Sequence, residues 1–206
     1  MNSQQTFITT ASRYGSDSRL IERLWGDITQ RYAESHRHYH TLAHLNNLIH
    51  ELEPLKATVQ DWDVLVFSVV YHDVIYRATQ SDNEAKSAEL AQNQLQKLGV
   101  DTSRIQRCKM QILATQHHQE STDPDANLLT DADLAILGKE WPTYQNYCQQ
   151  IRQEYAIFPD FLYRPGRRKV LHHFLEMDKI FKTPHFYTHY EQQARQNLAQ
   201  ELAELS

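Results

Sequence analysis

Histidine and aspartate gather at four places in this chain of 206 residues. The four segments are Arg37-His-Tyr-His-Thr-Leu-Ala-His44, Tyr71-His-Asp-Val-Ile-Tyr76, Thr115-Gln-His-His118 and Leu129-Thr-Asp-Ala-Asp-Leu134. Imidazole nitrogens and carboxylate oxygens together bind divalent transition metals, and both groups also transfer protons. We therefore expect the four segments to contribute to one metal-assisted site.

The spacing within the first two segments indicates how they would act. His40 and His44 are four residues apart, which places both on one face of a helix or at its entry, so that one can bind a metal and the other can donate a proton. His72 and Asp73 are neighbours inside the apolar stretch 62–76. A buried carboxylate needs a metal or a hydrogen-bonded partner. An ion pair between Asp73 and a neighbouring histidine is the alternative to a metal.

The elements that must position these residues are predicted to be helices. Only five glycines and six prolines interrupt long helix-compatible stretches. The stretch 62–76 is too apolar for periodicity to separate strand from helix, but its length favours a buried helix. We expect a flexible lead-in over residues 1–17 and a single all-α domain of about eight or nine helices over residues 18–206. The helices are predicted near residues 18–33, 41–56, 62–76, 81–99, 101–118, 131–137, 142–155, 166–181 and 184–205.

Composition excludes several classes of protein. The net charge is −5, and no basic stripe is present, which argues against duplex nucleic acid as the partner. No apolar run is long enough to span a bilayer, and the N-terminus does not resemble a secretory signal. The two cysteines, Cys108 and Cys148, lie far apart, so a reducing compartment, the cytoplasm, is expected. The oligomeric state stays open.

The order of His44, the pair His72-Asp73 and an aspartate before Leu134 resembles the HD superfamily of metal-dependent phosphohydrolases. The stretches YHDVIYRATQSDNEAKSAELA, LLTDADLAILG and IRQEYAIFPDFLYRPGRRKVL look like an uncharacterised bacterial branch of it. The resemblance implies an HD-type helical domain whose metal ligands are His44, His72, Asp73 and Asp133. Asp131 is the alternative fourth ligand; Asp133 is favoured because Leu129, Ile136 and Leu137 share its face of a helix.

The resemblance also implies a reaction and its catalytic residues. A metal ion would activate water to attack phosphorus; Mn²⁺, Fe²⁺, Co²⁺, Ni²⁺ and Zn²⁺ suit the ligands, and Mg²⁺ also fits. One metal is expected, because residues 74–80 hold no further histidine. His40 is similar in placement to the proton-donating histidine of cyclic-nucleotide phosphodiesterases. Glu84 is a candidate to orient the water, unless it forms a capping box with Ser81. His117 or His118 would contact the phosphate or act as an acid.

Substrate binding requires cations, and the candidates are Arg37, Arg77, Arg167 and Arg168. The last two belong to a basic run that is predicted to open a helix, where backbone N–H groups also bind phosphate. The predicted reaction is hydrolysis of a phosphate ester or anhydride in a small phosphorylated molecule, a nucleotide in particular. The alternative is a catalytically silent module that senses a nucleotide or a metal. Oxygenase chemistry at two irons is disfavoured by the missing histidine.

Overall fold

The computed structural model describes residues 2–15 and 17–205. Within this part of the chain there are ten α-helices, two short 3-10 helices and no strand. The α-helices are α1 (Ser3–Ala11), α2 (Ser18–Tyr32), α3 (Leu42–Leu52), α4 (Trp62–Tyr71), α5 (Asn83–Leu98), α6 (Thr102–Ala114), α7 (Pro124–Leu134), α8 (Trp141–Glu154), α9 (Asp160–Glu176) and α10 (Pro184–Glu204). The 3-10 helices are η1 (Glu53–Thr58) and η2 (Ala135–Gly138). The prediction of an all-α fold is confirmed, with ten α-helices in the described residues where about eight or nine were expected.

The additional helix is α1, which replaces most of the flexible lead-in predicted for residues 1–17. Asn2 caps it by accepting a hydrogen bond from the backbone N–H of Gln5 at 2.9 Å. Phe7 is fully buried, with its ring 5.5 Å from that of Trp25. The polar composition of this segment hid the helix, because a single large apolar side chain anchors it. Residues 1 and 16 of the predicted lead-in lie outside the described residues.

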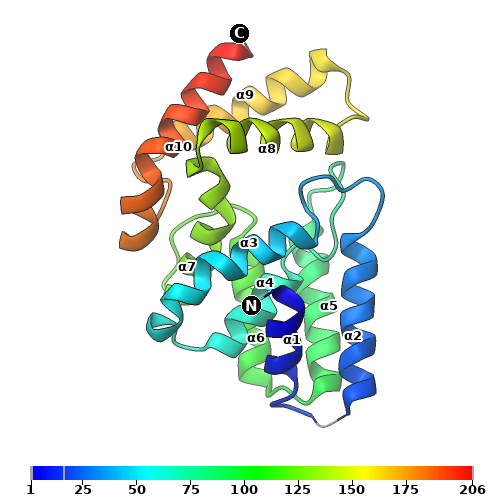
Figure 1. Ribbon diagram of the computed structural model, residues 1–206. Helices are drawn as coiled ribbons and strands as arrows, with labels where there is room; N and C mark the ends of the chain where they lie inside the picture. The colour runs from blue at the N-terminus through cyan, green and yellow to red at the C-terminus, as the bar shows by residue number, and fades with distance from the viewer. Residues whose placement is uncertain (1, 16, 206) are drawn as a thin grey trace. The chain divides into compact units, whose positions relative to one another are not determined.

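The chain divides into two compact units, Met1–Thr130 and Asp131–Ser206, and the boundary between them falls inside the stretch 18–206 that was predicted as one domain. In the first unit, α4 is the central helix, and α1, α3, α5 and α6 all pack against it (Figure 1). Every α4 residue from Asp63 to Tyr71 is buried. Contacts on all sides explain why the sequence of α4 is apolar all round rather than on one face.

The end of α4 differs from the prediction in a way that matters for the site. The helix stops at Tyr71, whereas a helix over residues 62–76 was predicted. His72 is its C-cap residue, and Asp73 follows in an irregular segment. The His72-Asp73 pair therefore stands at a helix terminus, where side chains from several elements can converge.

The boundaries of α5 and α6 follow local signals only in part. Gly99 ends α5 in the left-handed conformation (φ 83°), and Asp101 caps α6 by accepting a hydrogen bond from the N–H of Arg104 at 3.0 Å. Both were predicted. The capping box of Ser81 with Glu84 is not formed, because the N-cap of α5 is Asp82 and no side chain makes a cap hydrogen bond there. Glu84 instead lies in the first turn of α5.

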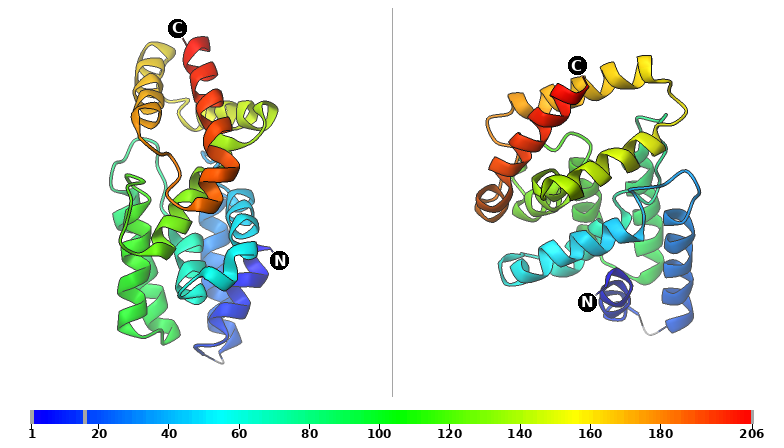
Figure 2. Two further views of the ribbon diagram at one scale, coloured as in Figure 1. Left: turned by 90° about the vertical axis from the view of Figure 1, so that its left-hand side faces the viewer. Right: turned by 45° about the horizontal axis from the view of Figure 1, so that its top comes forward.

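The second unit contains η2, α8, α9 and α10. Helix α10 packs against α9 and η2, and α8 also contacts η2 (Figure 2). The start of α9 was predicted wrongly: it begins at Asp160 rather than at residue 166, and it carries Pro165 inside. The basic run that contains Arg167 and Arg168 therefore lies within the helix and does not open it. No helix in the described part of the chain is long and apolar enough to cross a membrane.

Candidate metal centre

Three of the predicted metal ligands converge in the first unit. His44 is on the first turn of α3, while His72 and Asp73 stand at the end of α4. The Nε2 atoms of His44 and His72 are 3.2 Å apart. The Oδ2 atom of Asp73 is 3.0 Å from Nε2 of His72 and 3.8 Å from Nε2 of His44. Only 1% of each histidine and 9% of Asp73 is exposed.

The protonation of His72 suits a metal ligand. Its Nδ1 lies 2.8 Å from the backbone oxygen of Val69, and since a carbonyl oxygen only accepts, Nδ1 carries the hydrogen. In the neutral ring Nε2 then presents its lone pair to His44 and Asp73. This arrangement of a backbone carbonyl holding the far nitrogen is the usual support of a metal-binding histidine.

The distances between the three ligand atoms fit one ion. Ligands about 2.1 Å from a metal and at right angles to one another are roughly 3.0 Å apart, and wider angles give larger separations. The observed separations of 3.0–3.8 Å lie in that range. Together with Asp133, these residues form a group whose ligand atoms all lie within 4.8 Å of one another and which can hold a metal ion.

Asp133 stands on the last turn of α7, a single helix that begins in the first unit at Pro124. The competing candidate, Asp131, has other partners within the second unit. Its carboxylate is fully buried and accepts hydrogen bonds from the N–H of Lys182 at 2.9 Å, and from the N–H and hydroxyl of Thr183, both at 2.7 Å. These bonds attach the segment before α10 to α7. Asp131 is therefore occupied as a structural acceptor, which favours Asp133 as the fourth ligand.

His40, the predicted proton donor, lies at the edge of this group. It belongs to the irregular segment before α3, and its Nε2 is 3.8 Å from Oδ2 of Asp73. Its ring packs against that of Tyr76, with the centroids 4.2 Å apart. About 17% of the side chain is exposed, so the ring is accessible from solvent while its orientation is held by Tyr76.

Glu84 interacts electrostatically with members of this group and with His118. Burial raises the pKa of Glu84, and the negative charge of Asp73 raises it further, while the charges of His118 and His72 lower it. His118 adopts a left-handed backbone conformation (φ 50°) that is uncommon for residues other than glycine. His117 is exposed. Of the two predicted histidines, His118 is thus the one whose charge acts on Glu84.

The two predicted phosphate-binding arginines of the first unit have protein partners. Arg37 is buried, and its guanidinium donates to three backbone carbonyls, those of His40, Asp73 and Val74. Arg77 is half-exposed; its Nη1 donates to Nδ1 of His36 at 3.0 Å. Arg37 is therefore not accessible to a substrate, which corrects the expectation that it binds phosphate. Arg77 keeps an accessible side chain.

The two arginines of the second unit also differ from one another. Arg167 is buried and makes a bidentate ion pair with Glu201, with N–O distances of 2.7 and 2.8 Å. Its guanidinium is engaged by both carboxylate oxygens of Glu201, which argues against the predicted role in phosphate binding. Arg168 is exposed in the middle of α9. It therefore does not lie at a helix N-terminus, where the prediction placed it.

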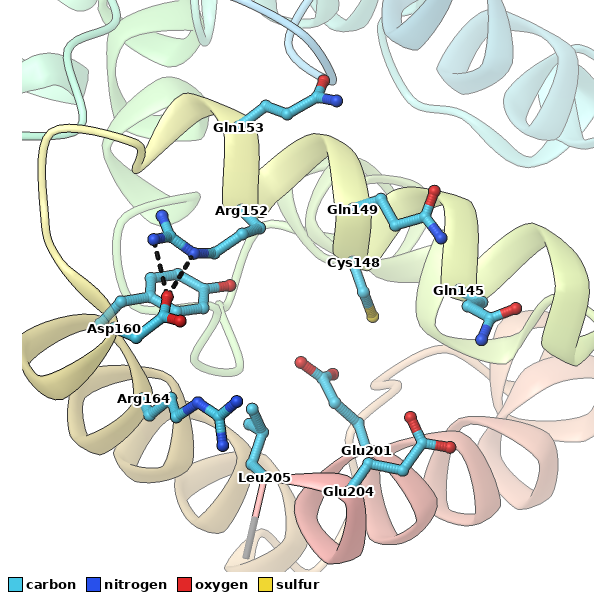
Figure 3. A pocket seen from close by; sticks show the side chains of 11 residues that line it. Gln145, Cys148, Gln149, Arg152, Gln153, Asp160, Arg164, Glu201, Glu204 and Leu205 are labelled. Carbon is cyan, nitrogen blue, oxygen red and sulfur yellow. Dashed lines mark hydrogen bonds and ion pairs between the residues drawn. The ribbon is translucent and has the colours of Figure 1, made fainter.

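The second unit also has a hollow of about 620 Å³ between α8, α9 and α10 (Figure 3). Arg152 and Asp160 face each other across one side of it, paired at 2.8 Å. Glu201 lies in its wall but is already bound by Arg167 and by the hydroxyl of Tyr144. Burial raises the pKa of the Cys148 thiol to about 12, which removes it as a nucleophile at neutral pH.

Two residues with a bearing on the site were not singled out from the sequence. Tyr76 holds the ring of His40, and Lys182 lies beside Asp131, its Nζ 3.6 Å from Oδ1. Burial lowers the pKa of Lys182, and the charges of Asp131 and Asp133 oppose that shift. No sequence signal connects Lys182 with Asp131, because the two are 51 residues apart.

Comparison of this chain with protein families, with characterised proteins and with solved structures finds no match. The assignment of a function therefore depends on the geometry and chemistry of the residues described above.

Proposed function

We propose that this protein is a metal-dependent phosphohydrolase of the HD type, which cleaves a phosphate ester or anhydride in a small molecule such as a nucleotide. The observation that carries the proposal is the convergence of the buried ligand atoms of His44, His72 and Asp73, with Asp133 in the same group. A mixed imidazole and carboxylate set suits Mn²⁺, Fe²⁺, Co²⁺, Ni²⁺ or Zn²⁺, and Mg²⁺ also fits. Four protein ligands would leave room for water and a phosphate oxygen on a six-coordinate ion.

The bound ion would supply Lewis acidity, which lowers the pKa of water and withdraws charge from a phosphate oxygen. The other steps belong to the chain. In this proposal Glu84, whose charge interacts with those of Asp73 and His118, takes the proton from the attacking water. His40, at the accessible edge of the group, is placed to donate a proton to the leaving oxygen. Arg77 remains as a cation for the substrate phosphate.

A panel of nucleotides assayed with Mn²⁺, Co²⁺, Ni²⁺ and Mg²⁺ tests the proposal. The metal-loaded protein is expected to release phosphate or a phosphorylated product, and His72→Ala and Asp73→Ala are expected to abolish that release. His50→Ala is the matched control, since His50 lies on α3 six residues after His44 but is exposed. If no nucleotide is cleaved, or if the two ligand variants retain activity, the proposal is wrong. Thermal stabilisation by a nucleotide without product would instead support a sensing module.

A further inference from the structure

Arg37 connects the two irregular segments that carry the catalytic side chains of the first unit. Its Nη1 donates to the backbone oxygen of Asp73 at 2.7 Å and to that of His40 at 3.2 Å. Its Nη2 donates to the backbone oxygen of Val74 at 3.1 Å. One guanidinium thus bonds the residue proposed as proton donor and a proposed metal ligand that is 33 positions further along the chain.

Neither segment is held by regular secondary structure. Residues 33–41 form the loop between α2 and α3, and residues 72–76 follow the end of α4. Backbone carbonyls beyond a helix terminus need partners from elsewhere, and a cation near a helix C-terminus is favourable because of the helix dipole. Arg37 provides hydrogen-bond donors and a positive charge to the segment that carries Asp73. Without it, three carbonyls around the site would lose their partner together.

Aromatic rings extend the same connection to the ring of His40. The guanidinium carbon of Arg37 lies 4.9 Å from the ring centre of Tyr32 and 5.5 Å from that of Tyr76. The Tyr76 ring in turn packs on the His40 ring at 4.2 Å. The Tyr32 hydroxyl donates to the backbone oxygen of Val70 in α4 at 3.1 Å, which ties this group to the central helix. Tyr76 therefore contacts both Arg37 and the side chain that Arg37 helps to position.

We propose that Arg37 is a positioning residue that sets the geometry between His40 and the metal ligand Asp73, and that its cation does not contact the substrate. The inference rests on the proposed function for the role of His40. The Arg37 side chain has no exposed surface, so a substrate phosphate cannot reach it. Lysine is a poor substitute, because a single ammonium nitrogen cannot span three carbonyls as the planar guanidinium does.

The test compares Arg37→Met with wild type in two measurements. The first is Mn²⁺ affinity by competition with a chelating dye; loss of a group that orients a ligand typically lowers affinity about 10- to 100-fold. The second is kcat on two phosphate esters, one with an alkyl alcohol and one with the acidic p-nitrophenol as leaving group. Because a displaced proton donor affects the poorer leaving group, kcat on the alkyl ester is expected to fall about 100-fold more than on the p-nitrophenyl ester.

Arg23→Met is the matched control, since Arg23 lies exposed on α2 and should change neither measurement. Circular dichroism establishes that each variant is folded. Should Arg37→Met unfold, Arg37→Lys keeps the charge and should show the same two effects at smaller size, with KM little changed. A folded variant at Arg37 with wild-type Mn²⁺ affinity and equal losses on both esters overturns the inference. If wild type cleaves neither ester, the nucleotide panel still decides the proposed function, and the Mn²⁺ titration alone decides whether Arg37 positions Asp73.

Discussion

Exchange of Asp131 for asparagine should separate a structural carboxylate from the proposed metal ligand Asp133, two residues away. Oδ1 of Asp131 accepts a hydrogen bond from the N–H of Lys182 at 2.9 Å, and Oδ2 accepts from the N–H and hydroxyl of Thr183 at 2.7 Å. An amide has only one oxygen. If that oxygen serves Thr183, the NH₂ group of the asparagine faces the N–H of Lys182, and two donors then oppose each other in a fully buried place.

The loss can be estimated from these contacts. Removing a hydrogen bond to a charged acceptor and leaving a buried donor unsatisfied costs about 3 kcal/mol. Each kcal/mol lowers the melting temperature of a chain of this size by about 2–4 °C, so Asp131→Asn should lower it by about 6–12 °C. Metal affinity should change little, because Asp131 is not among the grouped ligand atoms.

Asp133→Asn should behave in the opposite way. Asp133 is partly exposed, so its replacement should change the free energy of unfolding of the metal-free protein by less than about 1 kcal/mol. Its Mn²⁺ affinity should fall by about 100-fold or more, since loss of a ligand exceeds the effect of losing a supporting partner. Calorimetry in the presence of a chelator and a Mn²⁺ titration measure the two quantities separately. If the Asp131→Asn variant keeps its stability but loses metal affinity, the assignment of Asp131 as a structural carboxylate is wrong.

Three further outcomes are expected. Protein in free metal at 100 times Kd should be about 2.7 kcal/mol more stable than protein from which a chelator has removed the metal. The difference is measured as a lower melting temperature of the metal-free form. Gly138→Ala should cost about 1–3 kcal/mol in urea unfolding, because the added Cβ would lie 2.5 Å from Cβ of Tyr190, whereas Gly166→Ala, with nothing within 4 Å, should cost nothing. Burial opposes ionisation of Glu201, but the hydrogen bonds from Arg167 hold its pKa below 4.5. Its carboxylate therefore stabilises the fold above pH 4.5, and this contribution is lost as pH falls through the lowered pKa. The free energy of unfolding of Glu201→Gln should therefore depend less steeply on pH in the acid range than that of wild type. An unchanged pH dependence would contradict the role of the Arg167–Glu201 pair.

Local signals were sufficient where the cause of a feature is local. The apolar run that becomes α4, the glycine that ends α5 and the aspartate that caps α6 were all predicted, because each depends on a few neighbouring residues. The predictions failed where packing at a distance decides. Helix α1 depends on Phe7 contacting α2 and α4. Helix α9 begins after Pro159, six residues before the predicted start, and it accommodates Pro165 in its interior.

For the site, the residue types and their order indicated which side chains to consider. The fold decided which of them converge and which are bound by other partners. His44, His72 and Asp73 were named from the sequence, and the structure brings their ligand atoms together. Whether a charged group is available or occupied depends on partners far along the chain. Arg37 is occupied by the backbone near Asp73, and Asp131 by the segment before α10, contacts that span 36 and 51 residues. Such pairings arise only when helices pack, so the sequence by itself determined which metal-binding and charged side chains the chain offers, and the tertiary structure decided which of them converge and which are occupied by other partners.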